Sequence, residues 1–347
     1  MRVDLFDYEL PVDRIAQEAR PRGSSRLLRL DRVTGAVSHG MFRDLPDLLR
    51  PGDLLVRNDV RVRPARLFGR DSENRLLEIF LLRQTEARGR RWLALARPGR
   101  RAKAGRTLRF DKGLTAEVAE VHADGSRDVV FDRPLGDALL NRIGHTPLPP
   151  YIRRPAGAPD RPEDRDAYQT VFAREALAVA APTAGLHFTD EILSVLTAHG
   201  IEIADLTLAV GAGTFKPVTA EDTDAHVLPA EEVSVPAETA AAIARARAEG
   251  RRVVAVGTTV ARSLEAAARL PDVTASGRFA TDLFITPGFE FRAIDVLLTN
   301  FHLPRSTLLM LVSAFARRER VLAAYAEAVR EGYLFYSFGD AMLIDGS

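Results

Sequence analysis

The segment from Pro64 to Phe131 restricts the fold more than any other part of the chain, because it shows no helical periodicity. Short apolar runs follow one another here, separated by glycine, proline and aspartate turn signals. Strands are expected at 76–82, 91–96, 107–110, 114–121 and 127–131. A helix at 134–144 and a rigid proline-rich connection, residues 146–150, end the segment. Several short strands at this spacing are typical of a small barrel or sandwich, so we predict a barrel-like all-β domain over residues 64–150.

On both sides of this segment, strand-like apolar runs alternate with helical periods. After residue 151 the expected strands are 201–209, 252–256, 282–286, 294–299 and 334–338, and the expected helices are 190–199, 237–249, 260–270, 306–317 and 321–331. Before residue 64, strands at 26–30 and 52–56 flank a short helix at 42–50. Such alternation is typical of α/β folds. A chain of 347 residues also favours two domains. The fold class is therefore α/β, with a discontinuous domain formed by residues 1–63 and 151–347 and the barrel inserted into it.

Composition excludes several classes of protein. Without cysteine, the chain has no disulfide framework, no thiolate nucleophile and no cysteine-ligated metal. No apolar run approaches the length of about 20 residues that a membrane helix needs, and the first residues lack the apolar core of a signal peptide, so a cytoplasmic protein is expected. Lysine occurs only at 103, 112 and 216, so nearly all basic side chains are arginine. Arginine suits RNA, but an arginine-rich and alanine-rich proteome explains the same bias.

The stretch Ala180–Thr189 is the first candidate ligand loop. The apolar run 177–180 precedes it, and Thr189 is placed to cap the helix expected at 190–199. Between them lie Thr183, Gly185 and His187, which bring a hydroxyl, a flexible backbone and an imidazole into one short loop. In open α/β sheets, ligands bind at loops that follow the carboxyl ends of strands.

A second loop, Gly257-Thr258-Thr259, begins the helix that contains Arg262. Small residues at a helix N-terminus offer free N–H groups to an anion, and the arginine would add a bidentate hydrogen-bond donor. Simple capping by either threonine explains the loop equally well.

The third loop, 299–307, follows a strongly apolar strand and contains His302, with Ser306 as a helix cap. A histidine between Phe301 and Leu303 is also compatible with core packing. His187, His226 and His302 lack the close spacing of metal ligands, so no metal site is expected.

Gly211-Ala-Gly213 after a strand suggests a nucleotide-binding turn. That motif requires a helix directly after the glycines, and Pro217 opposes one. Close packing of this backbone against a ligand remains open. The chain has neither a serine-hydrolase elbow nor a Walker loop.

Ten stretches, in this order along nearly the whole chain, resemble the S-adenosylmethionine:tRNA ribosyltransferase-isomerase family of queuosine biosynthesis. They are Ser25–Leu28 with Gly52–Val56, Arg61–Leu67, Gly144–Ile152, Tyr168–Val171, Ala181–Phe188, Val210–Phe215, His226 with Glu231, Val256–Glu265, Thr299–Ser313 and Ser337–Ala341. Val60 stands where the family usually has a hydroxyl residue, and Ala176-Leu177 replace a Pro-Gly-like turn.

The resemblance implies an α/β domain with an inserted β-barrel, and a specific reaction. The ribosyl moiety of S-adenosylmethionine would be transferred to 7-aminomethyl-7-deazaguanine in the tRNA anticodon and isomerised. The products would be epoxyqueuosine in tRNA, adenine and methionine. S-adenosylmethionine would be a substrate, no cofactor is expected, and the implied partner is tRNA carrying the queuosine precursor base. We expect a monomer and no membrane partner.

The residues of the three loops are assigned roles on this basis. His187 and His302 would supply base and acid in an open order, and Asp282 or Glu231 would face the sulfonium or an amine. The substrate-binding set is Thr183, Gly185, Gly211, Gly213, Glu231, Thr258, Thr259 and Arg262. A shallow groove of arginines beside these loops would hold tRNA phosphates. Two alternatives are a non-catalytic tRNA-binding module and an S-adenosylmethionine-dependent RNA methyltransferase, and release of free adenine separates the reaction from both.

Overall fold

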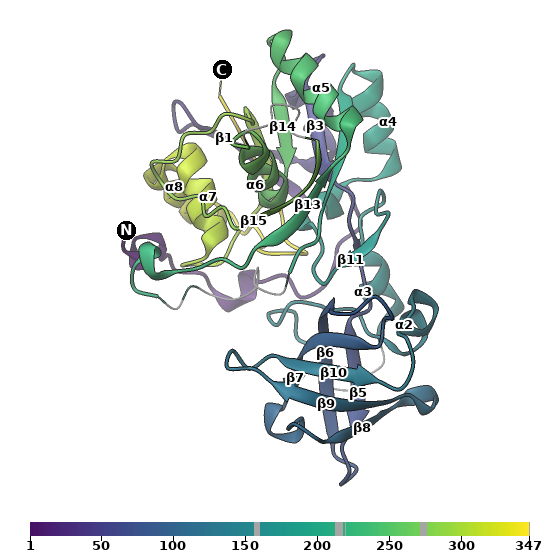
Figure 1. The fold of residues 1–347 in the computed structure, drawn as a ribbon. Helices are drawn as coiled ribbons and strands as arrows, with labels where there is room; N and C mark the ends of the chain where they lie inside the picture. The colour runs from purple at the N-terminus through teal and green to yellow at the C-terminus, as the bar shows by residue number, and fades with distance from the viewer. Residues whose placement is uncertain (156–159, 212–217, 219, 271–275, 347) are drawn as a thin grey trace. The chain divides into compact units, whose positions relative to one another are not determined.

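The computed structural model describes residues 1–346 except 156–159, 212–217, 219 and 271–275 (Figure 1). The chain forms two compact units. The first, the α/β unit, comprises Met1–Val60, Gln169–Glu175 and Ala181–Ser347. The second, the barrel unit, comprises Arg61–Tyr168 and Ala176–Ala180. The α/β class with an inserted barrel is confirmed, but the barrel unit extends past residue 150 because α3 (Pro162–Ala167) and the segment 176–180 also belong to it.

A nine-stranded mixed sheet organises the α/β unit, in the order β15-β13-β12-β3-β14-β16-β17-β1-β2. Its strands are β1 (Arg26–Asp31), β2 (Val37–Met41), β3 (Leu54–Asn58), β12 (Glu202–Leu208), β13 (Glu231–Val235), β14 (Val253–Val256), β15 (Gly277–Thr281), β16 (Val296–Asn300) and β17 (Ala341–Asp345). The four central strands β12, β3, β14 and β16 are parallel. Their carboxyl ends therefore lie along one edge of the sheet, where α/β folds bind ligands.

Helices and turns cover the two faces of this sheet. On one face, η3 (Phe42–Asp44), α1 (Leu45–Leu48), the 3-10 turn η6 (Thr183–His187) and α4 (Asp190–Ala198) share one apolar core with Leu55, Val254 and Leu298. The other helices are α5 (Ala237–Ala248), α6 (Thr258–Ala267), α7 (Thr307–Ala316) and α8 (Arg318–Arg330). Of these, α5 and α6 pack on β3, β12 and β14. The expected caps are confirmed, since Thr189 accepts from the Ile192 N–H and Ser306 accepts from the Leu309 N–H.

The barrel unit contains a closed six-stranded barrel in the order β10-β7-β6-β5-β8-β9. Its strands are β5 (Arg66–Arg70), β6 (Leu76–Gln84), β7 (Arg91–Arg97), β8 (Thr107–Phe110), β9 (Thr115–Val121) and β10 (Arg127–Phe131). The expected strands are all present, and β5 is additional. Leu67, Ile79, Trp92 and Val129 fill the interior. Closure pairs every strand with two neighbours, so the barrel has no open edge.

The apolar run before the first candidate loop is not part of the large sheet. Residues Ala176–Ala178 form β11, which pairs with β4 (Arg61–Val62) in a separate two-stranded sheet of the barrel unit. The prediction that this loop follows a strand of the main sheet is therefore wrong. A run of four small apolar residues indicates a strand but not its partner. The helix expected at 134–144 is α2 (Asp137–Ile143).

Two other predicted strands lie a few residues from the observed ones. Residues 282–286 are irregular and follow β15, because the Leu283 N–H turns back to the Thr281 hydroxyl. Residues 334–338 cannot form a continuous strand because Tyr336 has a φ of 72°, and the terminal strand is β17 instead. Among the described residues, no helix has the length and apolarity needed to cross a bilayer.

Candidate active site

The structure brings the three candidate loops together at one edge of the central sheet. At the end of β14, the Gly257 N–H donates to the Leu298 carbonyl of β16 at 2.7 Å. Gly257 has a φ of 93° and a ψ of 155°, a combination essentially restricted to glycine. A side-chain carbon at this position would lie 3.6 Å from the Ala184 Cβ, so the turn η6 packs directly against the start of α6.

His187 connects η6 to the end of β16. Its Nδ1 lies 2.9 Å from the Ser25 hydroxyl and its Nε2 lies 3.1 Å from Nδ2 of Asn300. The Phe42 ring lies 5.0 Å from the imidazole. The side chain is only 4% exposed, so these contacts replace water at both ring nitrogens.

The hydrogen bonds of Asn300 determine the tautomer of His187. Nδ2 of Asn300 also donates to the Tyr336 carbonyl at 3.0 Å, which holds the amino end of the amide toward both acceptors. Nε2 of His187 therefore accepts, and the ring proton is on Nδ1, where it donates to Ser25. Oδ1 of Asn300 is buried and has no hydrogen-bond partner among the described residues.

His302 lies next to the same strand end but in a different environment. Its Nε2 is 2.8 Å from the Thr299 hydroxyl, and its backbone N–H donates to the Tyr325 hydroxyl at 3.1 Å. The Tyr8 hydroxyl donates to its carbonyl. Burial lowers the pKa of His302 to about 3, and it lowers that of His187 to about 4. Both imidazoles are therefore neutral at pH 7.

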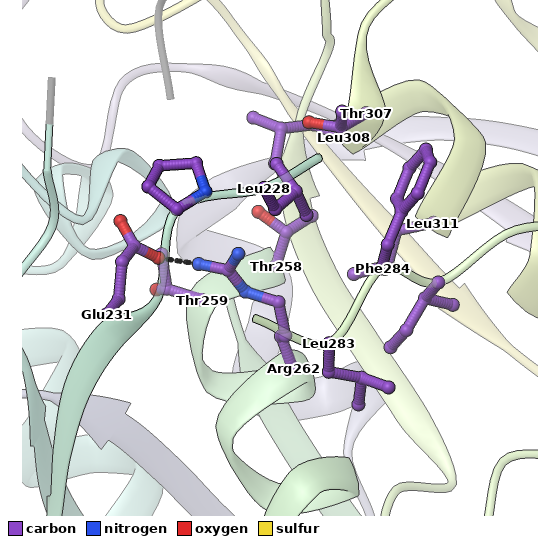
Figure 2. A pocket seen from close by; sticks show the side chains of 12 residues that line it. Leu228, Glu231, Thr258, Thr259, Arg262, Leu283, Phe284, Thr307, Leu308 and Leu311 are labelled. Carbon is purple, nitrogen blue, oxygen red and sulfur yellow. Dashed lines mark ion pairs between the residues drawn. The ribbon is translucent and has the colours of Figure 1, made fainter. Parts of the chain in front are cut away.

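A pocket opens beside the N-terminus of α6 (Figure 2). Four of the residues assigned to substrate binding line it: Glu231, Thr258, Thr259 and Arg262. Leu228, Pro229, Leu283, Phe284, Ile285, Thr307, Leu308 and Leu311 complete the lining. Neither loop histidine is among these residues, so the structure separates the histidines from the other polar groups of the site.

Capping does not explain the two threonines. Thr258 and Thr259 are the first two residues of α6, whose N-cap is Gly257 and has no side-chain cap. Within the part of the chain that the structure describes, neither threonine hydroxyl has a hydrogen-bond partner. Both side chains and the free N–H groups of the first turn are thus available to a ligand.

Arg262 and Glu231 form an ion pair in the wall of the pocket (Figure 2). Burial lowers the pKa of Arg262 to about 10, so the guanidinium remains charged at neutral pH. Oε1 of Glu231 accepts from the Gly211 N–H at 2.9 Å, which connects this carboxylate to the backbone shortly after β12.

Other predicted residues have different surroundings. Gly185 is a packing position, because a Cβ there would lie 2.8 Å from Thr170 and 2.9 Å from Phe172. Thr183 is half-buried at the start of η6, and Asp282 is exposed after β15. Gly213 lies outside the described residues.

Asn300 and Asp59 were missed by the sequence analysis. Asp59 directly follows β3, at the same edge of the sheet, and accepts from the Thr207 hydroxyl at 2.6 Å. Burial raises its pKa, and the nearby Asp205 acts in the same direction. The signal that could have found both residues is a polar side chain at the end of a buried strand, as in Leu54–Asn58 and Val296–Asn300.

The loop histidines do not form a metal site within the described ranges. His226 instead packs edge-on against Phe284, with ring centroids 5.5 Å apart. In those ranges, the one group with suitable geometry is Glu120, His122 and Asp128 in the barrel unit, and it is partly exposed.

Comparisons with known proteins agree with this architecture. The model of a family described as queuosine biosynthesis protein matches residues 3–344. A relative from Moorella thermoacetica and one from Heliobacterium modesticaldum are each 53% identical, covering 99% of this chain and 100% of their own length. Both are named S-adenosylmethionine:tRNA ribosyltransferase-isomerase.

A solved structure is also similar. The S-adenosylmethionine tRNA ribosyltransferase of Thermotoga maritima is 40% identical, with a TM-score of 0.56 over 98% of this chain and 99% of that one. A family match across nearly the whole sequence, together with full-length relatives at this identity, shows that the chain belongs to the queuosine biosynthesis protein family.

Proposed function

We propose that this protein transfers the ribosyl moiety of S-adenosylmethionine to 7-aminomethyl-7-deazaguanine in the tRNA anticodon and isomerises it. The products are epoxyqueuosine in tRNA, free adenine and methionine. The observation that carries this proposal is the 53% identity, over nearly the full length of both chains, to relatives named S-adenosylmethionine:tRNA ribosyltransferase-isomerase. The protein would act in the cytoplasm, where tRNA is modified.

The reaction requires proton transfers but no nucleophile from the enzyme. The sulfonium acidifies the adjacent carbon, so a base must remove a proton there, and an acid helps adenine to leave. The amine of the modified base attacks the sugar. The tautomer of His187 is consistent with a reaction that uses no nucleophile from the enzyme. Its Nδ1–H donates to the Ser25 hydroxyl and therefore does not activate that hydroxyl as a nucleophile.

We assign the binding of S-adenosylmethionine to the pocket beside α6. The N-terminus of α6 and Arg262 attract a carboxylate, the two threonine hydroxyls bind polar groups, and Phe284 with Leu311 offers an apolar wall to a flat ring. Glu231 offers a negative charge toward a sulfonium or an amine. Asp282 follows the strand that pairs with β13 and is retained as a second candidate for that role.

His187 and His302 remain the proposed base and acid. Both imidazoles are neutral at pH 7, so the base accepts the proton from the carbon next to the sulfonium, and the acid role requires that a proton accepted by an imidazole is passed on to adenine. Oδ1 of Asn300 is an acceptor at that edge, suited to an amine or hydroxyl of the bound substrates.

The test is release of free adenine when the purified protein is mixed with S-adenosylmethionine and tRNA carrying the precursor base. One adenine and one methionine per modified tRNA are expected. Formation of S-adenosylhomocysteine would instead indicate methyl transfer, and no turnover with intact tRNA binding would indicate a binding module. A tRNA transcript with unmodified guanine in the anticodon is the control and should release no adenine.

A further inference from the structure

The barrel unit has a groove of its own, of about 770 Å³, which the proposed chemistry does not use. Its walls come from β5, from β8, from the end of α2 with the turn to His145, and from residues 160–165. We call it the barrel groove. Its volume lies in the range of established ligand sites, about 300–1,000 Å³.

Positive charge dominates the lining of the barrel groove. Arg70, Arg109, Arg142 and Arg165 face two carboxylates, Asp111 and Asp160. Asp160 is already engaged, because it accepts from the Thr146 N–H at 2.6 Å and its other oxygen lies 3.0 Å from Nδ1 of His145. It therefore does not neutralise the arginines of β5 and β8.

Two of these arginines are direct cross-strand partners. Arg70 of β5 is opposite Arg109 of β8 in the antiparallel ladder. Within the described part of the chain, the Arg70 guanidinium donates to the Asn74 carbonyl at 2.8 Å and the Arg109 guanidinium donates to the Asp71 carbonyl at 3.4 Å, so neither hydrogen bond goes to a carboxylate. Like charges placed directly opposite each other destabilise a sheet. A bound anion between them would remove that cost.

The positive surface continues beyond the barrel groove. A second hollow, of about 330 Å³, is lined by Arg75, Arg100, Arg101, Lys103 and Arg106, with Asp71 and Glu73 as its carboxylates. Both carboxylates pair with Arg75, at 2.9 and 2.7 Å. The other four cations of this hollow are therefore left without a carboxylate in its lining. Arg109 connects the two hollows through the Asp71 carbonyl.

An aromatic surface accompanies the charge. Phe68 is half-buried in the barrel groove, and His145 packs on it edge-to-face with ring centroids 4.8 Å apart. The His145 N–H donates to the Arg66 carbonyl at 2.8 Å, which fixes this pair against β5. Cations beside a partly accessible ring are the combination with which proteins hold the backbone and bases of RNA.

We propose that the barrel groove and the adjoining hollow bind the phosphodiester backbone of tRNA, at nucleotides other than the one that reacts. This inference rests on the proposed function, since tRNA is the substrate there. The arginine pair Arg70–Arg109 is the centre of the site, and the cations of the second hollow extend it along the strand.

The experiment measures binding of a fluorescent, unmodified tRNA transcript to the full-length protein over a series of salt concentrations. The double variant Arg70→Ala/Arg109→Ala should bind about tenfold more weakly, and its salt slope should fall by about 1 to 2. The matched control is Arg83→Ala/Arg88→Ala, which removes two exposed arginines of the same unit outside both hollows. This control should bind like the wild type.

A charge reversal separates binding from folding. Arg109→Glu replaces the repulsive pair by an attractive one, so the thermal midpoint of unfolding should stay equal or rise. The tRNA affinity should nevertheless fall further than in Arg70→Ala/Arg109→Ala. The proposal would be overturned if both Arg70→Ala/Arg109→Ala and Arg109→Glu bound tRNA with the wild-type affinity and salt slope. The proposal would also be overturned if these variants lost affinity for inorganic phosphate but kept wild-type affinity for tRNA, because the site would then bind a small anion.

The two proposals fail in different ways. If the wild type releases no adenine, the proposed reaction is wrong, while the tRNA affinities still decide the role of the barrel groove. If adenine is released, the double variant should raise the KM for tRNA about tenfold and leave kcat and the KM for S-adenosylmethionine unchanged.

Discussion

Nε2 of His187 and Nδ2 of Asn300 lie 3.1 Å apart, and this contact joins the turn η6 to the end of β16. The same amide group donates to the Tyr336 carbonyl, so its orientation is fixed from two sides. A buried neutral imidazole whose ring proton is held on Nδ1 can accept a further proton only at Nε2, the nitrogen that faces Asn300. The amide is therefore as important to the proposed chemistry as the histidine.

Replacing Asn300 by Asp should change the protonation of His187. A carboxylate beside Nε2 favours the imidazolium, so the His187 pKa should rise well above its value of about 4. The Tyr336 carbonyl also loses its donor, which costs about 1–3 kcal/mol of stability. NMR titration of the imidazole nitrogens measures the first effect. An unchanged His187 pKa in a folded Asn300→Asp protein would mean that the amide does not control it.

His187→Ala should lower kcat for adenine release by about 10² to 10⁴-fold, the usual contribution of one placed acid or base. Binding of S-adenosylmethionine and of tRNA should remain, because His187 does not line the pocket beside α6. Single-turnover kinetics with precursor-bearing tRNA measure the step. His199→Ala, at an exposed histidine, is the control. Turnover at the wild-type rate would remove His187 from the proposed role.

The two buried histidines should make the fold sensitive to acid. Their pKa values of about 4 and about 3 lie below the ordinary value of 6.5, which the unfolded chain retains. Below pH 6.5 the unfolded state therefore binds more protons than the folded state. Stability should fall as the pH drops from 6.5 toward about 4, by on the order of 2 to 4 kcal/mol for His187. Urea midpoints across this range measure the effect, and His187→Gln should flatten the profile while His199→Gln does not.

Removing both Arg262 and Glu231 should restore much of the stability that is lost when Arg262 alone is removed, but it should not restore S-adenosylmethionine binding. Removing one partner of a buried ion pair costs about 3–5 kcal/mol, so Arg262→Leu should be strongly destabilised. The double variant Arg262→Leu/Glu231→Leu should recover much of that loss, since no buried charge remains unpaired. S-adenosylmethionine affinity should nevertheless fall at least about tenfold in both proteins. Calorimetry measures it, and normal affinity in the double variant would show that the pair is purely structural.

Gly257→Ala tests the turn that begins α6. The new Cβ would have ordinary contacts, so its cost is conformational, about 1–3 kcal/mol for a φ of 93°. Because the turn also positions Thr258 and Thr259, the KM for S-adenosylmethionine should rise. Gly250→Ala, at another positive φ but in open space, should lose stability without that change in KM. Equal KM values in the two variants would contradict a binding role for the turn.

Local sequence patterns were sufficient to predict features whose interacting residues are neighbours in the sequence. Thr189 and Ser306 could be assigned as caps because a cap and its helix are neighbours in sequence. β11 could not be placed, because its partner lies more than a hundred residues earlier. Asn300 was missed for the same reason, since its contact with His187 exists only after the sheet has formed. The ion pair of Arg262 with Glu231 likewise depends on the position of β13 beside β12.

The strand order of the large sheet also determines when it can be completed during synthesis. β3 is one of its four central strands but is made before the entire barrel, and its neighbours β12 and β14 are made after the barrel. β1 obtains its parallel partner only from β17, which includes Asp345 near the end of the chain. On the ribosome, the barrel strands are therefore all available to fold while β3 still lacks both neighbours. The α/β unit must therefore assemble around a strand whose second neighbour is complete only at Val256, and removal of β17 would leave β1 without its parallel partner.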